Sequence, residues 1–442
     1  MTRVSLDYDV IIIGGRPAGS TLAARLGKQG LRVLLLERAT FPGLPAVSSP
    51  IIYASTMKLL DEIGADEAEY ARNTPKIRRM NIFSSIINSH VIIPNDGKRD
   101  YAYAIDRARF DAALWDTAVS YPSVTGWQNF NVMDILMDGE RVVGVVGKDA
   151  QGQEHHLRSR LVIGADGRFS LLARKVGAAT LDEATDQPTT LYYAYWRGVK
   201  PYDESGEPTS TAYEGGYGYG FLVMDSADNT AAVCIEGQAG LLDPEPGKAE
   251  ALYLDLLMQK PEVARRLEGA EMVTSVRGMK KIGNSYRTAG GPGWALVGDA
   301  YHQKDPLDGQ GIYNAVFTAK ALAWAIRDWY KGEKSWKEAV AWYDETARIR
   351  TYAHYKALLT RVNESLYRQT EIPGWAQNTL MRWMMDDPAL QTLLGRFLTH
   401  QLPADMMMVM YPAAAAQAVV RGGLRDLRRR VEERLPFPLP RL

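Results

Sequence analysis

The sequence of 442 residues contains a single cysteine, Cys234, and no excess of charge of either sign. One cysteine excludes an intrachain disulfide bond and a cysteine-rich metal site. The 52 basic and 52 acidic residues give a formal net charge of zero. Such a balance provides no electrostatic field that would attract nucleic acid or an acidic membrane surface. We therefore expect no metal site and no nucleic-acid partner.

Long apolar runs are also missing. The most apolar late segment, residues 406–420, is broken by Pro412 and is too short to span a bilayer. The first apolar segment, residues 10–13, comes too early to follow a signal peptide. We expect a cytoplasmic protein without a membrane span, and 46% hydrophobic with 24% charged residues is ordinary for a globular chain.

The N-terminal segment has the pattern of a nucleotide-binding turn. A buried strand is predicted over residues 10–13, followed by a glycine-rich turn, a helix that ends by Gly30, and a second strand over residues 33–36. An acidic residue then follows, and it can accept both ribose hydroxyls of an adenosine while repelling a 2′-phosphate. This favours FAD or NAD over NADP. The cofactor-binding candidates are Gly14, Gly15, Arg16, Ala18, Gly19, Glu37 and Arg38.

Arg16 departs from this pattern. It occupies a position where glycine normally allows the backbone to approach the pyrophosphate. Its guanidinium group either turns toward the pyrophosphate or points to solvent and is tolerated in the turn.

Two later segments also combine a strand end with a carboxylate. In the first, LVIGADGRFSLLAR at residues 161–174, Asp166 and Gly167 follow a predicted strand, and Asp166 either binds a cofactor or caps a helix. In the second, residues 293–322, a predicted strand ends in Gly298 and Asp299. Gly309 and Gly311 then open a long helix, whose free N–H groups and positive dipole end favour a ligand.

The middle of the chain is rich in aromatic residues with β alternation. Five of them either line an apolar pocket that accepts a ring, or pack in the core with half of the rings on the far face: Tyr193, Tyr195, Trp196, Tyr217 and Tyr219. Ser48 and Ser49, in a proline-rich loop, either contact flavin or substrate or bond their own backbone.

Together these segments resemble the FAD monooxygenases related to p-hydroxybenzoate hydroxylase, a superfamily that includes geranylgeranyl reductases and flavin halogenases. The resemblance rests on GDAxHxxxPxxGxG at residues 298–311, on the GADG segment and on the N-terminal turn. It implies that Asp299 binds the ribityl chain of FAD and that the helix start faces the flavin ring. It also implies that Arg107, in IDRARFDAAL, lies on the flavin side, and that Asp166 and Gly167 serve FAD and NAD(P)H binding.

The implied fold class is α/β, with a Rossmann-like FAD-binding domain interleaved with a mixed β-sheet substrate domain and followed by a helical C-terminal region. We expect the FAD-binding domain to comprise residues 1–76, 100–180 and 272–335. The substrate domain would comprise residues 77–99 and 181–271, and the helical region residues 336–442.

The implied activity is that of an FAD-dependent oxidoreductase, with a monooxygenase as the first hypothesis. It would hydroxylate or epoxidise an apolar, aromatic or polycyclic small molecule through a flavin 4a-hydroperoxide, with dioxygen as substrate and NAD(P)H as transient electron donor. Pro306, His302 and Asp305 are the catalytic candidates, with His302 more architectural than acid or base. A homodimer and a separate flavin reductase are left open.

Three alternatives remain. A geranylgeranyl reductase-like enzyme would reduce isoprenoid double bonds, but its YxWxFP motif is matched poorly by GYGYGFLVM at residues 216–224. The WxWxIP motif of flavin halogenases is not found. A non-catalytic flavoprotein is disfavoured because all three flavin-binding segments are retained.

Overall fold

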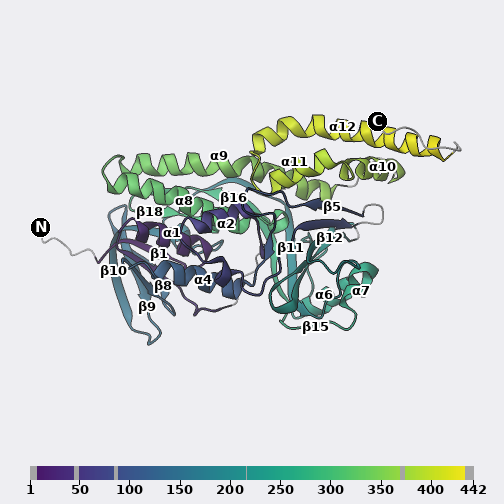
Figure 1. Ribbon diagram of the computed structural model, residues 1–442. Helices are drawn as coiled ribbons and strands as arrows, with labels where there is room; N and C mark the ends of the chain where they lie inside the picture. Colours follow the sequence, from purple (N-terminus) through teal and green to yellow (C-terminus); the bar gives the residue numbers. More distant parts are fainter. Residues whose placement is uncertain (1–6, 44–48, 84–87, 216, 369–373, 434–442) are drawn as a thin grey trace, which may run out of the picture.

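The computed structural model describes residues 7–43, 49–83, 88–215, 217–368 and 374–433. Two sheets lie side by side, and a layer of helices from the C-terminal part of the chain covers them along one side (Figure 1). The predicted α/β class with a helical C-terminal region is confirmed.

The first sheet has a parallel core in the order β18, β10, β1, β2, β7. Its strands are β1 (Tyr8–Ile13), β2 (Val33–Leu36), β7 (Val124–Trp127), β8 (Asn131–Asp138), β9 (Arg141–Lys148), β10 (Glu154–Gly164), β17 (Gly290–Gly291) and β18 (Trp294–Leu296). The residues of β2 are all buried. Such continuous apolar runs are expected where helices cover both faces of a parallel sheet.

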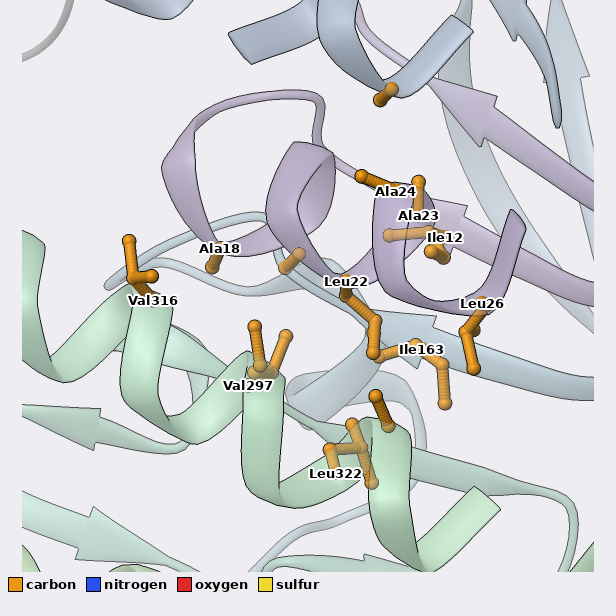
Figure 2. Packing of buried hydrophobic residues seen from close by; sticks show 14 of the residues in the cluster. Ile12, Ala18, Leu22, Ala23, Ala24, Leu26, Ile163, Val297, Val316 and Leu322 are labelled. Atoms are coloured by element: carbon orange, nitrogen blue, oxygen red, sulfur yellow. The ribbon is translucent and has the colours of Figure 1, made fainter. Parts of the chain in front are cut away.

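Helices α1 and α8 pack against each other beside this sheet. Figure 2 shows Ala18 and Leu22 of α1 facing Val316 and Leu322 of α8 across the apolar cluster. The helices of this half are α1 (Pro17–Lys28), α2 (Ala54–Asp61), α3 (Glu67–Tyr70), α4 (Arg107–Val119), α5 (Leu171–Lys175) and α8 (Gly311–Tyr330). Small residues on α1 and α8 allow these two helices to approach each other closely. The starts of both helices therefore lie near the strand ends of the first sheet.

The second sheet has the order β19, β16, β11, β14, β13, β12, β4, β5, with β15 paired to β11. Its strands are β4 (Arg79–Phe83), β5 (Asn88–Ile92), β11 (Thr180–Arg197), β12 (Thr209–Glu214), β13 (Tyr219–Asp225), β14 (Thr230–Gln238), β15 (Glu271–Met272), β16 (Arg277–Arg287) and β19 (His302–Gln303). All pairs are antiparallel except β12 with β4.

The two faces of this sheet have different neighbours. One face packs on α6 (Ala249–Gln259) and α7 (Pro261–Leu267), whereas the other packs on β3 (Ile51–Ile52) and β6 (Tyr103–Ala104). Strands β16 and β19 join this sheet although we assigned their residues to the FAD-binding domain. The domain boundaries therefore stay a prediction.

The C-terminal helices form a layer over α8 and the second sheet (Figure 1). They are α9 (Trp336–Val362), α10 (Gly374–Met385), α11 (Pro388–Leu398) and α12 (Ala404–Glu432), with a π-helical turn η4 (Asn363–Tyr367) after α9. Helix α9 begins with a capping box between Ser335 and Glu338. Among the described residues, no helix combines the length and the apolar character needed to cross a membrane.

We expect Leu22→Ala to lower the free energy of unfolding by about 2 to 5 kcal/mol, because the side chain is fully buried between two helices and the sheet. Thermal unfolding followed by circular dichroism measures the change. Ile349→Ala is the matched control, since Ile349 is 77% exposed on α9. Equal melting temperatures for the two variants would contradict the assigned packing.

Candidate functional site

A cavity of about 640 Å³ opens where the carboxyl ends of β1, β2, β10 and β18 meet the starts of α1 and α8. This volume is typical of a cofactor site, for which the range is roughly 300 to 1,000 Å³. The predicted residues that line it are Gly14, Arg16, Ala18, Glu37, Arg38, Ser49, Arg107, Asp166, Gly167, Asp299, Asp305, Pro306 and Gly311. The structure thus brings residues from all three segments together.

The turn between β1 and α1 is too tight for a side chain. Gly14 has a φ of 101°, and a Cβ added there would lie 2.5 Å from the carbonyl oxygen of Ala165. At Gly19 an added Cβ would lie 1.8 Å from the carbonyl oxygen of Gly14. Helix α1 then starts without a side-chain cap, and its first residues line the cavity. Its free N–H groups suit an anion such as a pyrophosphate.

Arg16 lines the cavity and is bound to a buried carboxylate. Its guanidinium lies 2.6 Å from Asp111 Oδ2, and Arg107 contacts Asp111 Oδ1 at 3.0 Å. Asp111 has no exposed surface. Two cations therefore share one carboxylate, which leaves net positive charge beside the start of α1. This arrangement lies between the two orientations considered for Arg16.

Glu37 is fixed at the end of β2. Its Oε2 accepts a hydrogen bond from the Gly15 N–H at 2.8 Å, and its Oε1 accepts one from the Ala39 N–H at 3.0 Å. The carboxylate is almost fully buried but lines the cavity. The exposed Arg38 follows it on the same cavity wall.

The two carboxyl oxygens of Asp166 have different surroundings. Oδ2 accepts a hydrogen bond from the Leu171 N–H at 2.7 Å, as a helix-capping residue would. Oδ1 is buried without a hydrogen-bond partner among the described residues. Burial raises the pKa of this carboxyl. Gly167 follows with a φ of 76° and open space beside it.

Asp299 is the most exposed carboxylate of the cavity wall. It makes no hydrogen bond or ion pair with any residue that the structure describes, although it lines the cavity. Desolvation raises its pKa, and the charges of Arg168, Arg107 and Lys304 oppose that rise. Such a carboxylate is placed to accept hydrogen bonds from ligand hydroxyl groups.

The start of α8 is shaped by two glycines. Gly309 adopts a φ of 67°, and a Cβ added there would lie 2.6 Å from the side chain of Ile51. Gln310, the N-cap, makes no side-chain capping bond, and a Cβ added to Gly311 would meet no atom within 4 Å. The helix start therefore leaves room for a ligand next to its positive dipole end.

These features fit FAD. The Glu37 carboxylate would hold the adenosine ribose, the uncapped start of α1 the pyrophosphate, and Asp299 the ribityl hydroxyls. The open space at Gly311 would accept the flavin ring.

His302 is not among the residues that line the cavity. Its ring stacks on Tyr286 at 3.8 Å, and Nδ1 donates to the carbonyl oxygen of Ser285 at 3.3 Å. Burial, with a smaller effect of Lys304, lowers its pKa from 6.5 to about 3. A histidine that stays neutral and does not reach the cavity is not placed to act as an acid or base.

Asp305 is fully buried at the wall of the cavity. Its Oδ1 accepts from the Leu307 N–H at 2.9 Å, and its Oδ2 accepts from the Thr189 hydroxyl. It therefore ties the loop before α8 to β11 of the second sheet.

The five aromatic substrate candidates do not line this cavity. Tyr193 and Tyr195 lie on the face of the second sheet that packs on β3 and β6. Trp196 and Tyr219 lie on the opposite face, and the Trp196 Nε1–H donates to the Tyr253 hydroxyl at 3.0 Å. The reason is the two-residue alternation of a strand. Tyr217 is exposed, and its hydroxyl donates to the carbonyl oxygen of Tyr367.

Of the two loop serines, Ser49 lines the cavity, whereas Ser48 lies outside the described residues.

Sequence reasoning missed Arg168 and Glu236. The Arg168 guanidinium lines the cavity and donates to the carbonyl oxygens of Gly283 and Lys304, both at 2.9 Å. Its place directly after Asp166 and Gly167 is a signal that could have found it. Glu236 is the one acidic residue of the apolar strand β14.

Comparisons with known proteins agree with this geometry. A family described as FAD binding domain matches residues 7–202. The chain is similar to 1H-pyrrole-2-carbonyl-[peptidyl-carrier protein] brominase of Pseudoalteromonas luteoviolacea, with 25% identity over 75% of this chain and 79% of the relative. It is also similar to a digeranylgeranylglycerophospholipid reductase of Methanosphaerula palustris, with 26% identity over 83% of this chain and 88% of the relative.

Solved structures show the same fold. The flavin-dependent brominase Bmp2 gives a TM-score of 0.74 at 23% identity, over 89% of this chain and 93% of that chain. The p-nitrophenol 4-monooxygenase PnpA from Pseudomonas putida gives a TM-score of 0.74 at 17% identity, over 90% of this chain and 99% of that chain.

We expect Asp299→Ala to weaken FAD binding roughly 10- to 150-fold, since a hydrogen bond to a charged group contributes about 1.5 to 3 kcal/mol. Flavin retained after dialysis and fluorescence titration of the apoprotein measure this. Asp138→Ala, at the exposed last position of β8, is the control. Unchanged, tightly bound flavin in Asp299→Ala would refute the assignment.

We expect His302 to destabilise the fold as the pH falls. Its folded pKa of about 3 lies below its ordinary value of 6.5, so the unfolded chain binds more protons between these values. Stability is therefore full above pH 6.5 and declines as the pH falls toward 3. His302→Phe, which preserves the stacking ring, should flatten this decline in pH-dependent melting curves. An identical decline in the variant and wild type would contradict the expectation, and the exposed His156→Phe is the control.

Proposed function

We propose that this chain, whose residues 7–202 match a family described as FAD binding domain, is an oxygenase of an apolar, aromatic small molecule. The observation that carries the proposal is the position of the FAD-compatible cavity against an apolar roof. The loop that contains Pro306 closes the cavity on one side, and the second sheet lies beyond it. FAD, when bound, would pass two electrons from NAD(P)H to dioxygen, of which one oxygen atom would go to the substrate and the other to water.

The roof would exclude water from the reaction site. The face of the second sheet that packs on β3 and β6 buries Leu191, Tyr193, Cys234 and Ile282. Ile282 also lines the cavity, so the apolar cluster reaches the site itself. A closed apolar pocket accepts a ring-shaped substrate and keeps water from competing with it.

The polar residues of the cavity would bind and orient rather than attack. Asp299 holds ligand hydroxyls, and the start of α8 favours negative charge next to it. Arg107 and Arg168 add positive charge to the cavity wall. The chain itself thus contributes binding, orientation and electrostatics.

The electron source is part of the proposal. NAD(P)H would dock transiently, or a separate flavin reductase would supply the electrons. The protein would act in the cytoplasm, and a homodimer is compatible with the proposal.

Two other activities are second candidates, because the chain is similar to relatives with these activities. The brominase relative favours halogenation of an aromatic ring. The digeranylgeranylglycerophospholipid reductase relatives favour reduction of isoprenoid double bonds. Each needs the same flavin site but a different second substrate.

One experiment separates the three. The purified holoprotein is reduced without oxygen and then mixed with isotopically labelled dioxygen in the presence of aromatic probes such as naphthol. We expect reoxidation of the flavin coupled to a product that carries the label. The same mixture with bromide or chloride tests halogenation, and an oxygen-free mixture with a geranylgeranyl compound tests reduction.

Labelled product without halide supports oxygenation. A halogenated product, or flavin reoxidation by the alkene without oxygen, would replace the proposal by the matching second candidate. Release of hydrogen peroxide alone with every probe would overturn the proposal.

A further inference from the structure

Strand β14 presents one carboxyl group to the inner face of the second sheet. Glu236 shares this face with Ala232 and Cys234, which belong to the apolar cluster under the roof. Its cross-strand neighbours are Leu191 and Gly220. A Cβ added to Gly220 would lie 3.2 Å from the carbonyl oxygen of Tyr213. Glycine therefore places no side chain beside Glu236, which is half-buried.

Glu236 lies next to Asp305 of the loop before α8, and the strand register explains why. Asp305 binds Thr189, which pairs with Gln238, whereas Glu236 pairs with Leu191 two residues along β11. Thr189 and Glu236 are therefore diagonal neighbours on one face, and Asp305 lies against both.

One proton must be shared by this pair. Two touching carboxyl groups away from water do not both ionise. Both oxygens of Asp305 already accept a hydrogen bond, Oδ2 from the Thr189 hydroxyl and Oδ1 from the Leu307 N–H. The proton therefore belongs to Glu236. Burial, followed by the charge of Asp305, raises the pKa of Glu236 well above its ordinary value.

Two further charged groups face Glu236 from neighbouring elements. Asp308, in the loop before α8, raises the pKa of Glu236, and Arg361 of α9 lowers it. Asp308 is paired with Lys304. The effect of Arg361 is smaller than those of burial and Asp305, so the pKa of Glu236 stays raised.

One oxygen of Glu236 is left without a partner. Oε1 is buried and makes no hydrogen bond with the described residues. Since the proton is directed to Asp305, Oε1 is an acceptor. A buried acceptor without a donor is unfavourable, so a ligand that brings an N–H or O–H group is favoured there over one that does not.

We propose that Glu236, anchored by Asp305, selects the substrate by accepting a hydrogen bond from an N–H or O–H group on an otherwise apolar ring system. Phenols and heteroaromatic rings with an N–H have this chemistry, whereas an unsubstituted isoprenoid chain does not. The inference rests on the proposed function, because the group that Glu236 recognises belongs to the substrate of the same site. A site built around a hydrogen bond discriminates strongly against analogues that lack the donor.

The test measures binding to the oxidised holoprotein, without an electron donor and without turnover. The probes are matched pairs, namely naphthol with its methyl ether and indole with N-methylindole. Perturbation of the flavin absorption spectrum gives each dissociation constant. In the wild type we expect the donor-bearing member of a pair to bind at least about tenfold more tightly.

Three variants locate the effect. Glu236→Leu should abolish the preference while leaving the affinity for the methylated probes unchanged. Glu236→Gln should retain it, because its amide N–H₂ donates to Asp305 and its oxygen accepts from the probe. Glu271→Leu, which removes an exposed carboxyl from β15 of the same sheet, is the control and should behave like the wild type.

A second measurement needs no ligand. The infrared carbonyl band of a protonated carboxyl group should be present in wild-type holoprotein and absent in Glu236→Gln. Flavin content and melting temperature verify that each variant is folded.

Equal responses within every pair, including no response to any probe, would overturn the inference, as would a preference that persists in Glu236→Leu. Absence of the infrared band would also overturn it. These results are independent of the oxygen experiment. A protein that never couples to oxygen but retains the Glu236-dependent preference would refute the proposed function and not this site.

Discussion

The structure depends on keeping polar groups unpaired inside an apolar interior. The N–H groups at the start of α1, Oδ1 of Asp166 and the carboxylate of Asp299 all face one cavity without a partner among the described residues. The buried Oδ1 of Asp166 costs about 1 to 3 kcal/mol while it is unsatisfied. Close packing around the cavity must offset this cost. The contact between α1 and α8 does so, with small residues such as Ala18 where the elements meet.

The cations of the cavity wall are immobilised in a related way. Asp111 binds Arg16 and Arg107 together, and Arg168 is held by two backbone carbonyl oxygens. A guanidinium that is already oriented loses little further conformational entropy when an anionic ligand arrives. The positive charge near Asp299 is thus available without rearrangement, and the carboxylate and the cations together suit a ligand that carries both hydroxyl and phosphate groups.

The local patterns of the sequence predicted the strand ends well, because a buried strand and its following turn are encoded by adjacent residues. Strand β2 has the predicted bounds, and Asp299 follows β18 as expected. Contacts between distant residues were beyond such reasoning. The pairing of Arg16 with Asp111 joins residues 95 positions apart. Alternation showed that Trp196 and Tyr195 face opposite ways, but only the packing of α6 and α7 decides which face is inward.

The C-terminal helices act on the cavity through the first turn of α8. Gln310, the N-cap of this helix, donates to the carbonyl oxygen of Leu398 at 2.8 Å, and its Oε1 lies 2.7 Å from His400 Nε2. His400 stacks on Tyr313 at 3.6 Å, and Arg350 of α9 donates to the Tyr313 hydroxyl. Burial lowers the pKa of His400 well below its ordinary value, so the contact is made by a neutral ring.

Gly309 and Gly311 flank Gln310, and the Gln310 N–H donates to Asp308 Oδ1 at 3.1 Å. The hydrogen bonds from the end of α11 also supply rigidity that the glycines remove. A helix start that must remain open to a ligand cannot be stiffened by side chains on its own open side. The hydrogen bonds from residues 398 and 400 hold it on the side away from the cavity. The C-terminal region therefore supports the cofactor site, although none of its described residues lines the cavity.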